Sequence, residues 1–338
     1  MAYRITDTLA ALEASRETPL DPTLARGLRD SRDVISGILS GSDARKLIIC
    51  GPCSIHSRDS ALRYAERLRT LASEVQDQVF LVMRAYFEKP RTAYAWKGFL
   101  HQPRVGEEPN LVQGLIEARA LLTEIAQLGL PTGTELLSPL LSSYLEELIA
   151  WGCIGARTSE SQTHRELASS LDIPIGFKNN TEGNIEVAVN GIISASRPHQ
   201  LVRMIDNAPH VVISEGNPSA HLVLRGRNYP QASTNYDENS VMSAADQLTS
   251  AGLSANLIID CSHGNSEGDF RRQRHVADEA LRHIQRGLPV SGVLIESHLR
   301  GGRVHESPDA PSDISITDPC LGWDDTERLI RTWAEALA

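Results

Sequence analysis

Polar or ionisable side chains lie at the end of each of eight short apolar runs in this sequence, or just after it. In chain order they are Cys53, Arg84, Glu135, Arg157, Lys178, Arg225, His263 and Glu296. A single charge in such a position is usually a solvated loop residue, but eight in eight indicate a shared function. Four of them are cations, and with Lys89 and Arg91 they predict a positive site for a substrate that carries phosphate or carboxylate groups. The alternative is a set of separate surface ion pairs.

Three other side chains of this set, together with Asp318 after the eighth run, could bind a metal ion. One sulfur, one nitrogen and two carboxylate groups are offered by Cys53, His263, Glu296 and Asp318. This mixture of donors suits one divalent first-row transition ion. The four residues lie far apart in sequence, so no local motif supports the grouping. A buried cysteine and a loop histidine with ordinary hydrogen bonds are the alternative.

Residues 50–53 read Cys-Gly-Pro-Cys, which has the spacing of thiol–disulfide exchange motifs. No tryptophan precedes Cys50, and Cys50 ends an apolar run that is typical of a buried strand. A chain with eight such runs is also far larger than a thioredoxin unit. Disulfide exchange is therefore a remote alternative for this protein.

Two further residues allow more than one chemistry. A lysine in an apolar strand, such as Lys178, can have a lowered pKa and form a Schiff base with a carbonyl substrate. The cations around it favour anion binding at least as strongly. Glu135 could act either as a base or by holding a water molecule.

The eight apolar runs predict the strands that must position these side chains. They cover residues 46–50, 79–84, 130–135, 153–157, 174–178, 221–225, 257–261 and 293–296. Segments with helical spacing separate or follow them, at 62–75, 115–128, 140–151, 164–171, 185–193, 241–251, 270–286 and 326–337. Near-continuous apolar strands that alternate with helices are typical of buried parallel βα units. We therefore predict an α/β fold, a (β/α)8 TIM barrel with its site at the carboxyl ends of the strands.

Two segments lie outside this βα repeat. Residues 1–45 form an N-terminal extension with a predicted helix at 24–39, and we expect it to serve oligomerisation or regulation. Residues 197–220 insert a small β element, with an extra strand at 210–214, before the sixth barrel strand. Because no low-complexity linker divides the chain, the prediction is one catalytic barrel over residues 46–338.

Composition excludes several classes of protein. The 338 residues include 33 basic and 43 acidic side chains, a formal charge of −10 that argues against a nucleic-acid partner. No apolar run approaches the ~20 residues of a membrane helix. Acidic residues interrupt the first twenty positions, so the start of the chain does not read as a secretory signal. Five cysteines without such a signal indicate reduced thiols and a cytoplasmic location.

At these residues the sequence resembles the type I 3-deoxy-D-arabino-heptulosonate 7-phosphate (DAHP) synthases of the enterobacterial and fungal subgroup. The resemblance spans residues 46–325. It is carried by GPCSIH (51–56), VMRAYFEKPRT (82–92), WKG (96–98), GTE (133–135), WGCIGARTSESQTHRELAS (151–169), GFKN (176–179), LRG (224–226), DCSHGNS (260–266), ESHL (296–299) and SITD (315–318). Several of these strings are long and occur in the same order, so the resemblance is specific.

The resemblance implies a transferase that condenses phosphoenolpyruvate with erythrose 4-phosphate, in the first step of the shikimate pathway. It implies one divalent ion (Mn²⁺, Co²⁺, Fe²⁺ or Zn²⁺), bound by Cys53, His263, Glu296 and Asp318. Phosphoenolpyruvate would contact Arg84, Glu135, Gly155, Ala156, Arg157, Lys178 and Arg225. Erythrose 4-phosphate would contact Lys89, Pro90, Arg91, Thr92 and Asp318. Lys89, Glu135 and His263 would share the acid–base work, in a homodimer or homotetramer; a related synthase that uses another aldose is the alternative.

This chain departs from the family pattern outside the predicted site. Leu136 and Ser138 replace a usual phenylalanine and aspartate, and residues 201–215 and the N-terminal segment also diverge. In the family these parts build a pocket for an inhibitory aromatic amino acid. The departures lead us to expect altered or absent feedback inhibition.

Overall fold

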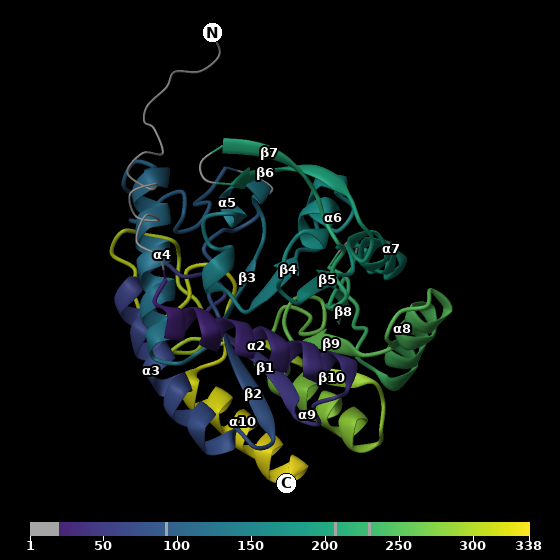
Figure 1. Ribbon diagram of the computed structural model, residues 1–338. Coiled ribbons are helices and arrows are strands. Elements are labelled where there is room, and N and C mark those ends of the chain that lie inside the picture. Colours follow the sequence, from purple (N-terminus) through teal and green to yellow (C-terminus); the bar gives the residue numbers. More distant parts are fainter. Residues whose placement is uncertain (1–19, 92–93, 206–207, 229–230) are drawn as a thin grey trace.

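The computed structural model describes residues 20–91, 94–205, 208–228 and 231–338 (Figure 1). Its centre is a closed barrel of eight parallel strands in the order β1-β10-β9-β8-β5-β4-β3-β2. The predicted (β/α)8 barrel is therefore confirmed. Thr92, which we predicted to contact erythrose 4-phosphate, lies outside the described residues.

The barrel strands agree closely with the apolar runs of the sequence. They are β1 (Lys46–Gly51), β2 (Val79–Arg84), β3 (Thr132–Glu135), β4 (Trp151–Ile154), β5 (Ile175–Lys178), β8 (His221–Leu224), β9 (Leu257–Asp260) and β10 (Val290–Glu296). The largest difference is β4, which we predicted at 153–157. The backbone N–H groups of Thr158 and Ser159 both donate to the carbonyl of Gly155, so the chain turns directly after Ile154.

Most of the described helices surround the barrel as a ring, and α2 crosses one end of it (Figure 1). They are α2 (Pro22–Ser40), α3 (Arg58–Val75), α4 (Leu111–Gln127), α5 (Pro139–Ser142), the 3-10 turn η1 (Glu146–Leu148), α6 (Gln162–Ser169), α7 (Glu186–Ala195), α8 (Glu238–Ser250), α9 (Arg272–Gln285) and α10 (Trp323–Leu337). None of them is long and apolar enough to span a membrane.

The helix predicted at 140–151 is wrong, because α5 ends after one turn. The hydroxyl groups of Ser142 and Ser143 donate to the backbone carbonyls of Pro139 and Leu140. Such side-chain bonds to the backbone compete with helix propagation. Residues 143–150 instead connect α5 to the start of β4, with only the short turn η1 between them.

Helix α2 closes the amino-terminal end of the barrel, where it lies across the strands (Figure 1). Its side chains Ile35, Ile38 and Leu39 belong to the same buried cluster as the inward-facing residues of the strands. Its C-terminal carbonyls accept hydrogen bonds from side chains just before β9 and at the start of β10. The barrel therefore has a packed floor, and its open end is the opposite one.

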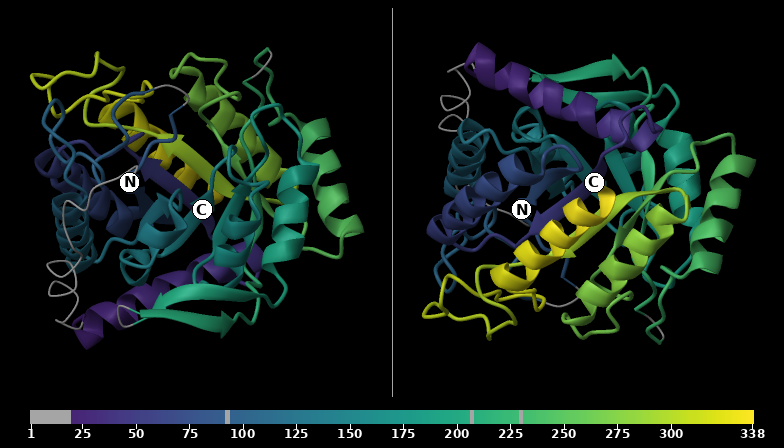
Figure 2. Two further views of the ribbon diagram at one scale, coloured as in Figure 1. Left: turned by 90° about the horizontal axis from the view of Figure 1, so that it is seen from above. Right: turned by 90° about the horizontal axis from the view of Figure 1, so that it is seen from below.

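The insertion before β8 is an antiparallel hairpin of β6 (Gln200–Ile205) and β7 (Ala208–Ile213). This confirms the predicted small β element and adds one strand to it. Both views of Figure 2 show the hairpin beside α2. Residues of the hairpin, of α2 and of the segment 169–174 line a cavity of about 650 Å³ at this place.

Candidate active site

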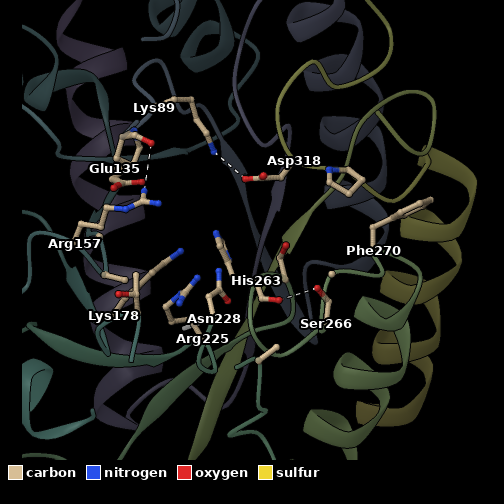
Figure 3. A pocket seen from close by; sticks show the side chains of 18 of the residues that line it. Lys89, Glu135, Arg157, Lys178, Arg225, Asn228, His263, Ser266, Phe270 and Asp318 are labelled. Atoms are coloured by element: carbon tan, nitrogen blue, oxygen red, sulfur yellow. Dashed lines mark hydrogen bonds and ion pairs between the residues drawn. The ribbon is translucent and has the colours of Figure 1, made fainter. Parts of the chain in front are cut away.

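A cavity of about 530 Å³ lies at the carboxyl ends of the barrel strands (Figure 3). Most of the predicted site residues line it, namely Lys89, Pro90, Arg91, Glu135, Gly155, Ala156, Arg157, Lys178, Arg225, His263 and Asp318. Three more predicted residues are fully buried beside this group: Cys53 donates to Asp318, Glu296 lies 3.9 Å from His263, and Arg84 donates to Glu296. The structure thus brings together every predicted site residue that it describes.

Three potential metal ligands gather beside this cavity. The Sγ of Cys53 and carboxylate oxygens of Glu296 and Asp318 all lie within 4.8 Å of one another. Burial and the nearby Glu296 carboxylate raise the pKa of the Cys53 thiol to about 12. A bound cation would have to offset this effect for the sulfur to become a thiolate.

His263 points its ring toward the same group. Its Nε2 lies 3.9 Å from Oε1 of Glu296. The backbone of His263 has φ 56°, in the left-handed region that side chains other than glycine rarely adopt. Strain of this kind is concentrated at functional sites. The donors that lie close to one another are Cys53, Glu296 and Asp318, a sulfur and two carboxylates that suit a transition ion, and His263 places a ring nitrogen next to one of them.

Lys89 reaches the potential metal ligands from the loop after β2. Its Nζ donates to Sγ of Cys53 at 2.9 Å and lies 3.3 Å from Oδ2 of Asp318. Burial opposes the charge of Lys89, but Cys53, Asp318 and Glu296 together raise its pKa. Lys89 is therefore an ammonium group at neutral pH, held where it can donate a proton into the cavity.

Two guanidinium groups on the cavity wall have no carboxylate partner among the described residues. The side chain of Arg157 donates to the backbone carbonyl of Pro90 at 3.3 Å and forms no ion pair with any described residue. Arg225 is only 3% exposed, and its Nη1 has no hydrogen-bond partner in the described part of the chain. Burial lowers the pKa of Arg225. An anionic ligand would supply the missing acceptors.

The other predicted cations do have carboxylate partners, and most of these lie within the site. Arg84 donates to Glu296 at 3.1 Å, and both side chains are buried. Only Arg91, which lies 3.4 Å from Glu306, forms a partly exposed pair outside this group. The alternative of separate surface ion pairs therefore does not describe this cluster.

Gly155 leaves room for the carboxylate of Glu135 in its present position. A Cβ atom at residue 155 would overlap with Oε1 of Glu135. The Glu135 carboxylate therefore packs directly against the turn that follows β4. This contact places it at the edge of the cavity, beside the guanidinium-bearing loop.

The sequence prediction missed Asp260, the last residue of β9. It is fully buried, 2.7 Å from Nζ of Lys178 and 2.9 Å from Nδ1 of His263. Burial opposes its charge, but His263 and Lys178 hold the pKa of Asp260 well below its usual range. An acidic residue inside the apolar run 257–261, three positions before His263, was the available signal.

Two residues that support Glu296 were also missed. Gln273 on α9 donates to the backbone carbonyl of Glu296 at 3.0 Å and accepts from its N–H at 2.8 Å. Ser262 donates its hydroxyl to Oε2 of the same residue at 2.8 Å. Nothing in the sequence marks Gln273, because its helix has ordinary amphipathic spacing. The cavity is further lined by Thr181, Asn228, Ala232, Ser266, Glu267, Gly268, Phe270 and Pro319.

The structure argues against the two alternative chemistries, a Schiff base on Lys178 and disulfide exchange by Cys50 and Cys53. Although burial works against the charge of Lys178, the Asp260 carboxylate raises its pKa, whereas a Schiff-base lysine needs a lowered one. Cys50 is fully buried in the core between strands and helices, and burial raises its pKa to about 12. A reactive thiol is instead partly exposed and has a lowered pKa.

Fold and site together define a (β/α)8 enzyme with a metal-ligand group and a cationic cavity for small phosphorylated or carboxylated anions. Comparison with known proteins narrows this class. The chain belongs to the DAHP synthetase I family, whose model matches residues 17–331.

Curated relatives and a solved structure agree with this family. The chain is 43% identical to the Tyr-sensitive phospho-2-dehydro-3-deoxyheptonate aldolase of Escherichia coli K12, over 93% of this chain and 88% of the relative. It is 40% identical to the Trp-sensitive protein of that strain, over 99% and 96%. The solved structure of a phospho-2-dehydro-3-deoxyheptonate aldolase from Francisella tularensis SCHU S4 superposes with a TM-score of 0.95 at 36% identity, covering 99% and 98%.

Proposed function

We propose that this protein condenses phosphoenolpyruvate with erythrose 4-phosphate and water, giving DAHP and inorganic phosphate as the first step of the shikimate pathway. Its family membership supports this reaction. The observation that carries the proposal is that Arg157 and Arg225, on the wall of a cavity beside potential metal ligands, form no ion pair with a carboxylate in the described part of the chain. A substrate with both a phosphate and a carboxylate would use these cations.

Phosphoenolpyruvate would bind at the cationic wall of the cavity. Its contacts would come from Arg84, Glu135, Gly155, Ala156, Arg157, Lys178 and Arg225. Arg157, Lys178 and Arg225 lie on one side of the cavity and Asp318 on the other (Figure 3). Each charge-assisted hydrogen bond to such a ligand contributes about 1.5–3 kcal/mol.

Erythrose 4-phosphate would bind on the side formed by the loop after β2. Its contacts would come from Lys89, Pro90, Arg91, Thr92 and Asp318. The phosphate of this substrate would compete with Glu306 for Arg91, whose present pair is 3.4 Å long and partly exposed. An exposed ion pair of this kind contributes little free energy, so little stability is lost when Arg91 exchanges Glu306 for a phosphate.

The four potential ligands would hold one divalent ion, for which Mn²⁺, Co²⁺, Fe²⁺ and Zn²⁺ are the candidates. Cys53, Glu296 and Asp318 fit such an ion by distance and donor type, and we add His263 as the nitrogen ligand. When bound, the ion would act as a Lewis acid toward the aldehyde oxygen of erythrose 4-phosphate.

The residues of the chain would then move protons and stabilise charge. As C3 of phosphoenolpyruvate forms a bond to the aldehyde carbon, Lys89 donates a proton to the aldehyde oxygen. Glu135 accepts a proton from the water that adds to C2. The resulting hemiketal phosphate loses inorganic phosphate by cleavage of its C–O bond, and Arg157, Lys178 and Arg225 stabilise the departing anion.

One assay tests the reaction and its main alternative. Loss of phosphoenolpyruvate absorbance is followed with erythrose 4-phosphate or arabinose 5-phosphate, after chelation and after addition of Mn²⁺ or Co²⁺. We expect turnover with erythrose 4-phosphate alone, loss on chelation and recovery with either ion. Turnover with arabinose 5-phosphate only would replace this assignment by that of a related synthase. Activity that survives exhaustive chelation, or Cys53→Ala, would remove the metal from the proposal.

We also propose a homodimer or homotetramer and a cytoplasmic location. The hairpin leaves Val202, Val211 and Ile213 exposed on its surface, which supports self-association. The five free cysteines support a reducing compartment. Light scattering after size exclusion would test the first proposal, and fractionation of the source cells would test the second.

A further inference from the structure

Asp260 occupies the junction between the two halves of the candidate site. Its Oδ2 lies 2.7 Å from Nζ of Lys178 and 2.9 Å from Nδ1 of His263. Its Oδ1 accepts a hydrogen bond from the backbone N–H of Ser262 at 3.0 Å. Asp260 does not line the cavity, so it acts on a ligand only through these neighbours.

The contact with His263 decides which ring nitrogen faces the potential metal ligands. The Asp260 carboxylate lies 2.9 Å from Nδ1 without hydrogen-bond angles, and its charge favours the proton on that nitrogen, which leaves the lone pair on Nε2. Nε2 is the nitrogen that lies 3.9 Å from Oε1 of Glu296. Asp260 therefore holds His263 in the tautomer and orientation that a metal ion requires.

The contact with Asp260 fixes the position of the Lys178 ammonium group. Lys178 is 4% exposed and shares the interior of the site with the buried guanidinium groups of Arg84 and Arg225. Asp260 supplies the negative charge that keeps the ammonium fixed among these cations. Without it the ammonium would lose its only carboxylate partner among the described residues.

We propose that Asp260 is a positioning residue that connects the metal site to the phosphoenolpyruvate site. One carboxylate oxygen orients a metal-binding imidazole and a substrate-binding ammonium at the same time. The inference rests on the proposed function, since it assigns these roles to His263 and Lys178. It follows that removing the charge of Asp260 lowers the affinity for both the metal ion and phosphoenolpyruvate, although Asp260 contacts neither.

The test is Asp260→Asn, with Cys261→Ala as the matched control. The asparagine amide has the same shape, but it cannot accept from all three donors that now surround Asp260. Cys261 is the next residue, equally buried, and belongs to the core between strands and helices. We expect Asp260→Asn to weaken Co²⁺ binding by about 10–100-fold, the usual effect of losing such a support. The control should bind Co²⁺ like the unmodified protein.

Two binding readouts separate positioning from mere structural support. Co²⁺ affinity is read from the visible absorption of the bound ion, and phosphoenolpyruvate affinity from calorimetry at saturating Co²⁺ without the second substrate. We expect both affinities to fall by about tenfold or more. A folded Asp260→Asn variant with a lower thermal midpoint but unchanged affinities would overturn the proposal.

Double variants test the route of the effect. In a His263→Ala background, Asp260→Asn should cause no further loss of Co²⁺ affinity, while it still weakens phosphoenolpyruvate binding. An equal loss of Co²⁺ affinity in both backgrounds would show that Asp260 does not act through His263. If Asp260→Asn does not fold, the Lys178→Met/Asp260→Asn pair removes the unpaired ammonium. Its Co²⁺ affinity should then be lower than that of Lys178→Met alone.

A different result would refute the proposed function. An unmodified protein that does not consume phosphoenolpyruvate with erythrose 4-phosphate would refute the reaction. The Co²⁺ titrations of the variants would still decide whether Asp260 supports His263.

Discussion

Replacement of Arg225 by methionine should move stability and substrate affinity in opposite directions. The guanidinium is 3% exposed, its Nη1 has no hydrogen-bond partner among the described residues, and burial lowers its pKa. Leaving a buried polar group without a partner costs about 1–3 kcal/mol. Methionine has a similar length and no such requirement, so the unliganded variant should be more stable by up to this amount.

The same change should weaken phosphoenolpyruvate binding. A charge-assisted hydrogen bond contributes about 1.5–3 kcal/mol, and each 1.4 kcal/mol is about a factor of ten in affinity. We therefore expect the KM for phosphoenolpyruvate to rise by about 10–150-fold. Urea unfolding with and without phosphoenolpyruvate, together with steady-state kinetics, measures both effects on one preparation.

The control for this prediction is Arg286→Met. Arg286 pairs with Glu238 on the surface, and both side chains are exposed. This variant should change the unfolding free energy by less than about 0.5 kcal/mol and leave the KM unchanged. If Arg225→Met destabilises the unliganded protein and leaves the KM at its original value, the assignment of Arg225 as an anion-binding group is wrong.

Four further predictions address other parts of the molecule. Gly155→Ala should lower kcat/KM by about tenfold or more, because its methyl group displaces the Glu135 carboxylate; kinetics at fixed metal would check this. Ile35→Ala should cost about 2–5 kcal/mol in urea unfolding with unchanged kcat, because its cavity lies in the barrel floor. Burial lowers the pKa of His221 to about 4, so stability should fall by about 1.4 kcal/mol per unit as pH drops from 6.5 towards 4, with a shallower slope in His221→Asn. Finally, the departures at Leu136 and Ser138 from the expected family pattern predict that inhibition by millimolar phenylalanine, tyrosine or tryptophan is altered or absent, which steady-state kinetics would check.

Much of the barrel was predictable because its strands are buried on both faces. Runs such as residues 46–50 and 79–84 are short, apolar and bounded by polar residues. Where such runs alternate with helical segments, they indicate buried parallel strands. Parallel strands bring their carboxyl ends together, so residues far apart in sequence could be assigned to one site. The helix expected at 140–151 failed because side-chain bonds of Ser142 and Ser143 are not visible in hydrophobic spacing.

The residues that support the site were harder to predict than those that line it. Gln273 holds the backbone of Glu296 from a helix 23 positions earlier, and its spacing resembles that of any half-buried helical residue. The role of Asp260 depends on two partners, Lys178 and His263, and one of these lies 82 residues away. Residue types show which groups can do chemistry, while their partners are set by three-dimensional packing alone.

The floor formed by α2 also has a consequence for the order of events during synthesis. This helix leaves the ribosome before any barrel strand, yet two of its hydrogen-bond donors, Asn256 and Ser291, follow their acceptors by 217 and 253 residues. Its apolar side, including Ile35, must therefore wait for most of the chain. Contacts of such sequence separation slow folding and prolong exposure of apolar surface. The apolar side of α2 thus stays exposed in the nascent chain until β9 and β10 have been synthesised.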